Sequence, residues 1–307
     1  MSQTREISLS IGRFQEKFGE LGALEAAAKA GTKIVDFSTL SMERYDVRLS
    51  DSIYSKSDEE IVEHFTKIRK RAEELGLRFG QTHGKSHGFV FDKEEDEAHI
   101  ENIRRDCLVA ATLGAPICVL HGVTTMRTGP NVSAQTMRDA NFEMFTSVIP
   151  FAKQYGIKLA TETFGDAVRY DCCDFFGQID EFIATYDRIC AVDDFANYFS
   201  VCVDTGHSNK AARFGEPKAE EVIRMLGSRI SCLHLNDNDS LTDQHKAPGM
   251  GNINWTEVLN ALDEVGYSGT YNLELALEFF GQNLLEETAA FSIKVTKELL
   301  RRHYANK

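Results

Sequence analysis

Short apolar runs alternate with longer amphipathic stretches along the whole chain. Eight of the runs have the composition of β-strands, at residues 6–10, 33–38, 78–82, 115–120, 158–163, 199–204, 230–235 and 270–275. Between them, apolar residues recur at helical spacing, for example over 59–75 and 98–113, and a glycine suited to a helix C-terminal cap follows each of these two stretches. The pattern predicts eight successive strand and helix units.

Eight such units are typical of an α/β protein whose parallel strands close into a (β/α)8 TIM barrel. Spread over 307 residues they average about 38 residues each, against roughly 30 in a minimal barrel, which leaves room for modest loop insertions. No linker or low-complexity segment divides the chain, so we expect residues 1–307 to form a single barrel domain. An open doubly wound sheet is the alternative, but Gly12-Arg13-Phe14 follows the first run where that fold would place a Gly-x-Gly-x-x-Gly phosphate loop.

The composition is that of an ordinary globular protein, with 42% hydrophobic and 26% charged residues. No apolar run approaches the roughly 20 residues that a membrane helix needs, and residues 1–6 lack the apolar stretch of a signal peptide. We therefore expect a cytoplasmic protein with no membrane association. The seven cysteines form no Cys-x-x-Cys pair, so we expect buried reduced thiols and no structural zinc site.

Acidic and histidine side chains follow the later runs at the points where the strands end. In a parallel barrel all strands end at one mouth, where active sites lie, so these side chains should meet there. They bind divalent metals such as zinc, manganese, cobalt and magnesium. The set is His83, His121, Glu162, Asp204, His207, His234, Asp243, His245 and Glu274.

Glu162 and Glu274 stand out because each lies inside an otherwise apolar run. An unpaired carboxylate buried there would cost several kcal/mol, roughly the penalty for burying an uncompensated charge. A bound cation would remove that cost. The alternative is that each glutamate pairs with a lysine or arginine in the barrel.

Several motifs resemble those of the xylose isomerase-like barrel superfamily, which contains sugar and sugar-phosphate isomerases and epimerases, inosose dehydratases and endonuclease IV. The resemblance covers the whole chain through its barrel rhythm, and it is most specific in the second half. The motifs are Thr-Glu-Thr-Phe-Gly around Glu162, Val-Asp-Thr-Gly-His at 203–207, His-Leu-Asn-Asp-Asn-Asp at 234–239, Asp-Gln-His-Lys-Ala-Pro-Gly-Met-Gly-Asn-Ile-Asn-Trp at 243–255 and Gly-Tyr-Ser-Gly-Thr-Tyr-Asn-Leu-Glu at 266–274.

The resemblance implies a site for one divalent ion of manganese, zinc, cobalt or magnesium. Its ligands would be Glu162, Asp204, His234 and Glu274, and Glu162 and Glu274 would also be the catalytic pair that flanks the substrate. The substrate-binding residues would be His207, which would contact a substrate oxygen, together with His83, His121, Asp243 and His245.

Such a site suits proton abstraction next to a sugar carbonyl. A cation stabilises the resulting enediolate, while one carboxylate takes the proton and the other returns it. Return to the opposite face gives an epimerase, and return to the neighbouring carbon gives an aldose–ketose isomerase. Dehydration of a cyclic polyol, as in an inosose dehydratase-like lyase, would use the same residues. We expect the glycine-rich turn at 248–252 to position Trp255 and not to bind phosphate, so the substrate can be a free sugar or polyol.

Endonuclease IV is the main rival, because it uses nine ligands for three zinc ions and all nine residues of the set above match. Charge argues against DNA as a partner, since 47 acidic residues outnumber 34 basic ones and the net charge is −13. We therefore place sugar chemistry ahead of abasic-site DNA cleavage. A barrel that binds metal and ligand without turnover is a third alternative, and a homo-oligomer is left open.

Overall fold

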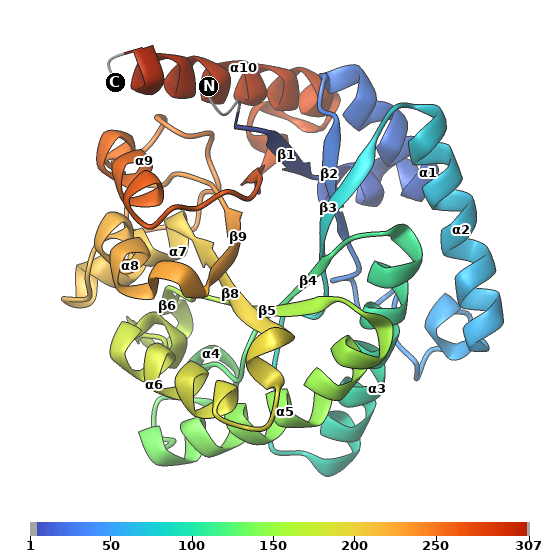
Figure 1. Cartoon of the computed structure of the whole chain (residues 1–307), viewed down its shortest axis with the longest axis vertical. Helices are drawn as coiled ribbons and strands as arrows, with labels where there is room; N and C mark the ends of the chain where they lie inside the picture. The colour runs from blue at the N-terminus through green and yellow to red at the C-terminus, as the bar shows by residue number, and fades with distance from the viewer. Residues whose placement is uncertain (1–4, 306–307) are drawn as a thin grey trace.

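Eight parallel strands form the central sheet in this computed structural model, which describes residues 5–305 (Figure 1). They occur in the order β10-β1-β2-β3-β4-β5-β8-β9. A parallel bridge between Leu235 and Leu273 joins the two ends of this order, and the Leu235 amide donates to the Asn272 carbonyl at 2.7 Å. The ring therefore closes, which confirms the predicted TIM barrel and excludes the open sheet. The strands are β1 (Ile7–Ser10), β2 (Ile34–Ser38), β3 (Arg78–His83), β4 (Ile117–Leu120), β5 (Lys158–Glu162), β8 (Phe199–Asp204), β9 (Ile230–His234) and β10 (Tyr271–Leu273).

Helices surround the barrel, and the first and last of them, α1 and α10, pack side by side to complete the outer ring (Figure 1). The short helices α4 and α7 follow the ends of β4 and β8 and so lie on the side of the mouth. The helices are α1 (Gly12–Ala30), α2 (Asp58–Glu74), α3 (Lys93–Leu113), α4 (Thr125–Thr128), α5 (Ala134–Tyr155), α6 (Ile179–Cys190), α7 (Thr205–Ala211), α8 (Ala219–Leu226), α9 (Trp255–Glu264) and α10 (Leu285–Ala305).

Capping residues set where two helices begin and end, α2 and α3, for which the sequence pattern predicted residue ranges. Helix α2 begins one residue before the expected 59–75 stretch, because Ser57 and Glu60 form a capping box. Helix α3 begins five residues before the expected 98, because the Asp92 side chain accepts hydrogen bonds from the amides of Glu94 and Glu95. It ends at Leu113, and the cap residue Gly114 follows with a φ of 79°, which favours glycine.

The connection after β5 carries a hairpin that the sequence pattern did not predict. Its strands β6 (Asp166–Ala167) and β7 (Cys172–Cys173) are antiparallel and only two residues long, too short to show a period. A buried ion pair between Lys210 of α7 and Asp166, at 2.7 Å, fixes the hairpin beside the mouth. Short 3₁₀ turns occupy other connections: η1 (Ile53–Ser55), η2 (Val168–Tyr170), η3 (Phe175–Gly177), η4 (Phe195–Asn197), η5 (Ala212–Phe214), η6 (Gly227–Arg229), η7 (Leu277–Phe280) and η8 (Gln282–Leu284).

The main apolar core lies between the sheet and the surrounding helices, and a smaller cluster of Val119, Ala160, Cys202 and Cys232 lies apart from it. Three members of the small cluster precede Glu162, Asp204 and His234 by two residues, so they share the inward face of their strands. All seven cysteines are free thiols, and four of them are buried. Within residues 5–305, no helix combines the length and the apolar character needed to cross a membrane.

Candidate metal centre and active site

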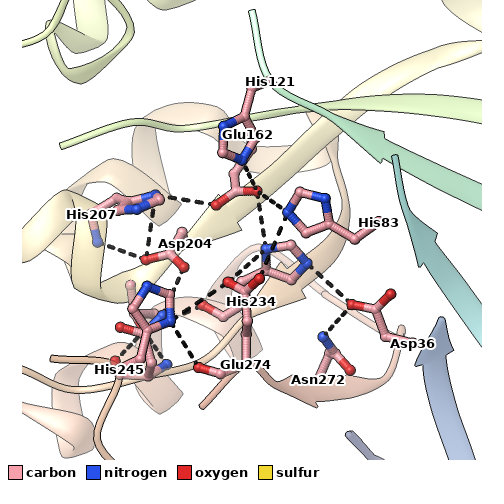
Figure 2. Close-up of polar contacts among 12 residues, drawn as sticks. Asp36, His83, His121, Glu162, Asp204, His207, His234, His245, Asn272 and Glu274 are labelled. Carbon is pink, nitrogen blue, oxygen red and sulfur yellow. Dashed lines mark hydrogen bonds and ion pairs between the residues drawn. The ribbon is translucent and has the colours of Figure 1, made fainter. Parts of the chain in front are cut away.

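All nine of the predicted side chains converge on the mouth of the barrel, and Figure 2 labels each of them except Asp243. Seven of them line a pocket of about 530 Å³, a size that accepts a small-molecule substrate. Asp204 and His234 lie beneath it and are fully buried. The seven lining residues are His83, His121, Glu162, His207, Asp243, His245 and Glu274.

The four residues predicted to bind one ion come from β5, β8, β9 and the residue after β10. One ligand atom from each of Glu162, Asp204, His234 and Glu274 lies within 4.8 Å of the others, a spacing that a single cation could bridge. The Nδ1 atom of His234 lies 3.1 Å from Glu162 and 3.3 Å from Glu274. Glu162 Oε1 and His234 Nδ1 are buried and form no hydrogen bond among the described residues, although His207 Nδ1 lies 3.1 Å from the first atom and Glu162 Oε2 lies 3.1 Å from the second. A bound cation would satisfy both atoms.

The turn from β8 to α7 holds the Asp204 side chain in place. Asp204 ends β8 and caps α7, because its Oδ1 accepts a hydrogen bond from the His207 amide at 2.6 Å. Its Oδ2 accepts from the Asn236 side chain at 2.7 Å. Both carboxylate oxygens are therefore oriented before any ion binds.

The imidazoles and carboxylates of the site perturb one another strongly. Burial alone would raise the pKa of Glu162, but the neighbouring imidazoles of His234 and His121 bring that pKa well below its usual value. Burial would likewise lower the pKa of His234, but Glu274 and Glu162 bring it well above its usual value. Burial raises the pKa of Asp204 to about 6, with the His207 imidazole opposing the shift. Protonated imidazoles thus compensate the negative charge of the buried carboxylates, and a bound cation could take over this role.

Three of the site's histidines share one arrangement of their ring nitrogens. In each, Nδ1 lies 3.1 Å from a backbone carbonyl oxygen. Because a carbonyl can only accept, Nδ1 carries a proton, and in the neutral ring Nε2 presents a lone pair to the site, as metal-ligating histidines do. The pairs are His83 with Gly84, His207 with Thr163, and His245 with Glu274.

Two further groups of side chains that could bind a metal ion lie next to the group of Glu162, Asp204, His234 and Glu274. His83 and His121 approach Glu162 Oε2 with their Nε2 atoms at 3.4 and 3.2 Å. On the other side, Asp243 Oδ2 lies 3.6 Å from His207 Nε2 and 3.3 Å from His245 Nε2. Ligand atoms within each group lie no more than 4.8 Å apart. The structure therefore brings together all nine residues of the predicted set, while their roles as ligands stay predictions.

The backbone at His245 is strained, which is common at functional sites. Its φ of 43° lies in the left-handed region that non-glycine residues rarely adopt. Two hydrogen bonds hold it there: the Ala276 amide donates to its carbonyl at 2.9 Å, and its Nδ1 donates to the Glu274 carbonyl. The strain aims the imidazole at Asp243.

The alternative partners considered for the two buried glutamates are excluded. Their ion-pair partners are imidazoles, and no lysine or arginine within residues 5–305 pairs with either. At the mouth, Arg13 is engaged by Glu16 at 3.2 Å and Glu278 at 3.4 Å. The two carboxylates are thus left available to a cation or a proton.

The glycine-rich turn is bonded within its own loop. Asp237 accepts hydrogen bonds from the Gly249 amide at 2.9 Å, the Ile253 amide at 3.2 Å and the Trp255 indole at 2.8 Å. These groups are therefore not free to cradle a phosphate. Phe164 lines the pocket and lies against His121 and His207, with ring centroids 5.4 and 4.9 Å apart, so it offers an apolar wall.

Several polar residues around the site were not found from the sequence. Asn236 holds Asp204, and Cys202 lies within ligand distance of Glu162 and His234. Burial raises the pKa of the Cys202 thiol well above its usual value, so it stays protonated. Asp36, inside Ile-Val-Asp-Phe-Ser of β2, is buried 3.4 Å from His234. The signal that identified Glu162, a charge within an apolar run, also marks Asp36.

The chain matches, over residues 24–297, a family model described as xylose isomerase-like TIM barrel. It is similar to protein MJ1311 of Methanocaldococcus jannaschii, with 29% identity over 175 residues, 57% of this chain and 56% of that protein. It is also similar to an inosose isomerase of Halalkalibacterium halodurans, with 26% identity over 228 residues, 70% of this chain and 74% of that protein. The chain spans little more than half the length of the first curated relatives that it matches.

Solved structures of the same fold cover nearly the whole chain. A D-tagatose 3-epimerase-like protein aligns with a TM-score of 0.72 and 20% identity, covering 98% of this chain and 99% of that one. The IOLI protein, solved with a zinc atom, aligns with a TM-score of 0.69 and 17% identity, covering 98% of each. At these identities the likeness shows the fold. Together with the family match, it confirms the resemblance that the sequence motifs predicted.

Proposed function

The chain belongs to the xylose isomerase-like TIM barrel family, and from that premise we propose that it is a metal-dependent sugar or polyol isomerase or epimerase. The observation that carries the proposal is the placement of Glu162 and Glu274 around one buried cluster of ligand type at the floor of the pocket. Relatives named inosose isomerase and structural neighbours named as sugar 3-epimerases support the same reaction class.

In this proposal Glu162, Asp204, His234 and Glu274 hold one divalent ion. Three carboxylates and one imidazole suit cations from magnesium and manganese to cobalt and zinc, and the zinc in the IOLI structure supports an ion in this fold. When bound, the ion would supply Lewis-acid stabilisation of negative charge on the substrate oxygens.

The two glutamates then divide the proton transfer. They come from strands separated by β8 and β9 in the ring, and both approach His234 (Figure 2). A carboxylate whose pKa lies below its usual value is ionised at neutral pH, so Glu162 can remove a proton from carbon next to a carbonyl. Glu274 then returns a proton from the other side. The face and the carbon that receive it decide between epimerisation and isomerisation.

The rest of the pocket positions a polyhydroxylated substrate. The Nε2 atoms of His83, His121 and His207 face the site and can bond hydroxyl or carbonyl oxygens. Phe164 provides an apolar wall for the C–H face of a ring or chain. An inosose dehydratase-like elimination would use the same base and the same pocket.

Zinc-dependent cleavage of abasic DNA is the second candidate, because the nine residues fall into three groups of potential metal ligands, two of which share Glu162. Two observations weigh against it. The net charge of −13 disfavours a polyanion, and Arg13 at the mouth already pairs with two glutamates. We therefore place sugar chemistry first.

A single screen tests both candidates. The purified protein is analysed for metals, then incubated in D₂O with a panel of ketoses, ketose phosphates and inososes, and separately with an abasic oligonucleotide. Deuterium appearing next to the carbonyl of one compound, with DNA left intact, supports the proposal. Cleavage of the oligonucleotide with no exchange in any ketone would replace it by the second candidate.

A further inference from the structure

Asp36 is a buried carboxylate that the proposed reaction does not use. It lies in the middle of β2, is fully shielded from solvent, and has no lysine or arginine partner within residues 5–305. Its Oδ1 atom has no hydrogen bond among those residues. A carboxylate in this position is costly unless something else compensates for its charge.

Side-chain amides on neighbouring strands fix the direction in which Asp36 points. Gln81 of β3 and Asn272 of β10 both donate to its Oδ2, at 3.2 and 3.0 Å. Asn272 is itself fixed, because its own oxygen accepts from Ser8 of β1 at 2.9 Å. This network inside the barrel holds Oδ2 of Asp36 towards His234 (Figure 2).

His234 is oriented differently from the other histidines of the site. In His83, His207 and His245 a backbone carbonyl holds Nδ1 and Nε2 faces a carboxylate of the site, although Nδ1 of His207 also lies 3.1 Å from Glu162 Oε1. In His234 the inward nitrogen is Nδ1, which faces the two glutamates. Its outward Nε2 lies 3.4 Å from Asp36 Oδ2, so a charged acceptor takes the place of the carbonyl.

We propose that Asp36 is a positioning residue for the metal centre, an inference that rests on the proposed function. By accepting a hydrogen bond from His234 Nε2, Asp36 keeps the proton on that nitrogen and leaves the Nδ1 lone pair for the cation. Carboxylate–histidine–metal arrangements of this kind orient the ring and make it a stronger ligand.

Gln81 shows why a cation would select this arrangement. Its amide nitrogen lies 3.0 Å from His234 Nε2, so a ring with its proton on Nδ1 can accept a hydrogen bond from Gln81. A cation on Nδ1 removes that option and places the proton on Nε2, where Asp36 Oδ2 at 3.4 Å can accept it and the Gln81 amide nitrogen must move aside. Asp36 therefore favours the metal-binding tautomer of His234 over the other one.

The first test is the affinity of the protein for Zn²⁺ and Mn²⁺, measured by competition with a chromophoric chelator. Asp36→Asn and Asp36→Ala should each weaken binding by about 10- to 100-fold, the usual effect of losing such a partner. Ser8→Ala, which alters the same network but leaves the Asp36 carboxylate beside His234, is the matched control and should lose much less affinity than Asp36→Asn. In a His234→Ala background, Asp36→Asn should have little further effect. Equal affinity of Asp36→Asn and wild type overturns the inference, as does an equal loss in Ser8→Ala.

A second measurement needs no variant and so does not depend on the Asp36 variants folding. In the zinc-loaded wild type, long-range ¹H–¹⁵N spectra of the histidine rings should show His234 bound through Nδ1, with a slowly exchanging proton on Nε2. Binding through Nε2 overturns the inference. These tests are independent of turnover: metal binding that depends on Asp36 without proton exchange in any ketone would refute the proposed function alone.

Discussion

Nδ1 of His234 lies 3.1 Å from Oε2 of Glu162, and both side chains are buried at the floor of the pocket. Two such groups at this distance share a proton or a cation, and the second arrangement gives the site its chemistry. Whether the cluster around this pair binds metal, and whether its carboxylates move protons, can each be measured.

Replacing either glutamate by its amide should abolish turnover without unfolding the protein. Glu162→Gln and Glu274→Gln each keep the side-chain volume but remove the proton acceptor, so exchange of substrate deuterium should fall by roughly 10²- to 10⁴-fold. Metal content measured on the same samples separates loss of a ligand from loss of the acid–base group. The exposed Glu73→Gln on α2 is the control. Full activity in either site variant would refute its assigned role.

Removing the metal should destabilise the native state as well as inactivate it. A ligand present at 100 times its dissociation constant adds about 2.7 kcal/mol to the unfolding free energy, which corresponds to roughly 4 °C in a chain of this size. Calorimetry of the protein before and after chelation, and after addition of Mn²⁺ or Zn²⁺, measures this. An unchanged melting temperature in all three states would contradict a site of this affinity.

The number of ions can be counted with His245→Ala. If the centre holds one ion through Glu162, Asp204, His234 and Glu274, the variant should retain the metal content of the wild type, because His245 belongs to the outer group with Asp243 and His207. If the wild type binds three ions, the variant should lose about one per chain. Elemental analysis measures the metal content, and a loss of one ion per chain would favour the second candidate function, cleavage of abasic DNA.

Asp174, which is not one of the nine candidate site residues, provides a pH prediction. It is buried and accepts from the amides of Met126 and Phe176, and burial raises its pKa from 3.8 to about 6. The folded state therefore binds this proton more tightly than the unfolded state does. Its stabilising contribution is complete below about pH 3.8 and is lost as the pH rises through 6, a difference on the order of 3 kcal/mol.

Asp174→Asn removes this titration, so the variant should gain stability relative to the wild type between pH 4 and pH 6.5, because the wild type alone loses free energy of unfolding over this range. Urea denaturation at both values measures the difference. Asp180→Asn, an exposed acid on α6, serves as the control. A wild-type-to-variant difference that is the same at both pH values would show that Asp174 does not carry the raised pKa.

The barrel and the convergence of the nine side chains could be predicted because parallel strands end at one mouth, which makes strand-end residues neighbours. His83 and Glu274 are far apart in sequence yet lie 3.7 Å apart for this reason. Asp36 could not be found in the same way, because it lies in mid-strand and its partners, Gln81 and Asn272, come from β3 and β10. The β6–β7 hairpin is held by Lys210 of α7, a long-range contact without a local signal.

The most direct test of the central claim is a metal titration of the stripped protein in D₂O with the ketose or inosose that the screen identifies. We predict that deuterium enters next to the carbonyl only when metal is added, and that the exchange rate saturates at one equivalent per chain. Exchange that is independent of metal, or an activity that needs three equivalents and cleaves abasic DNA, would contradict the account.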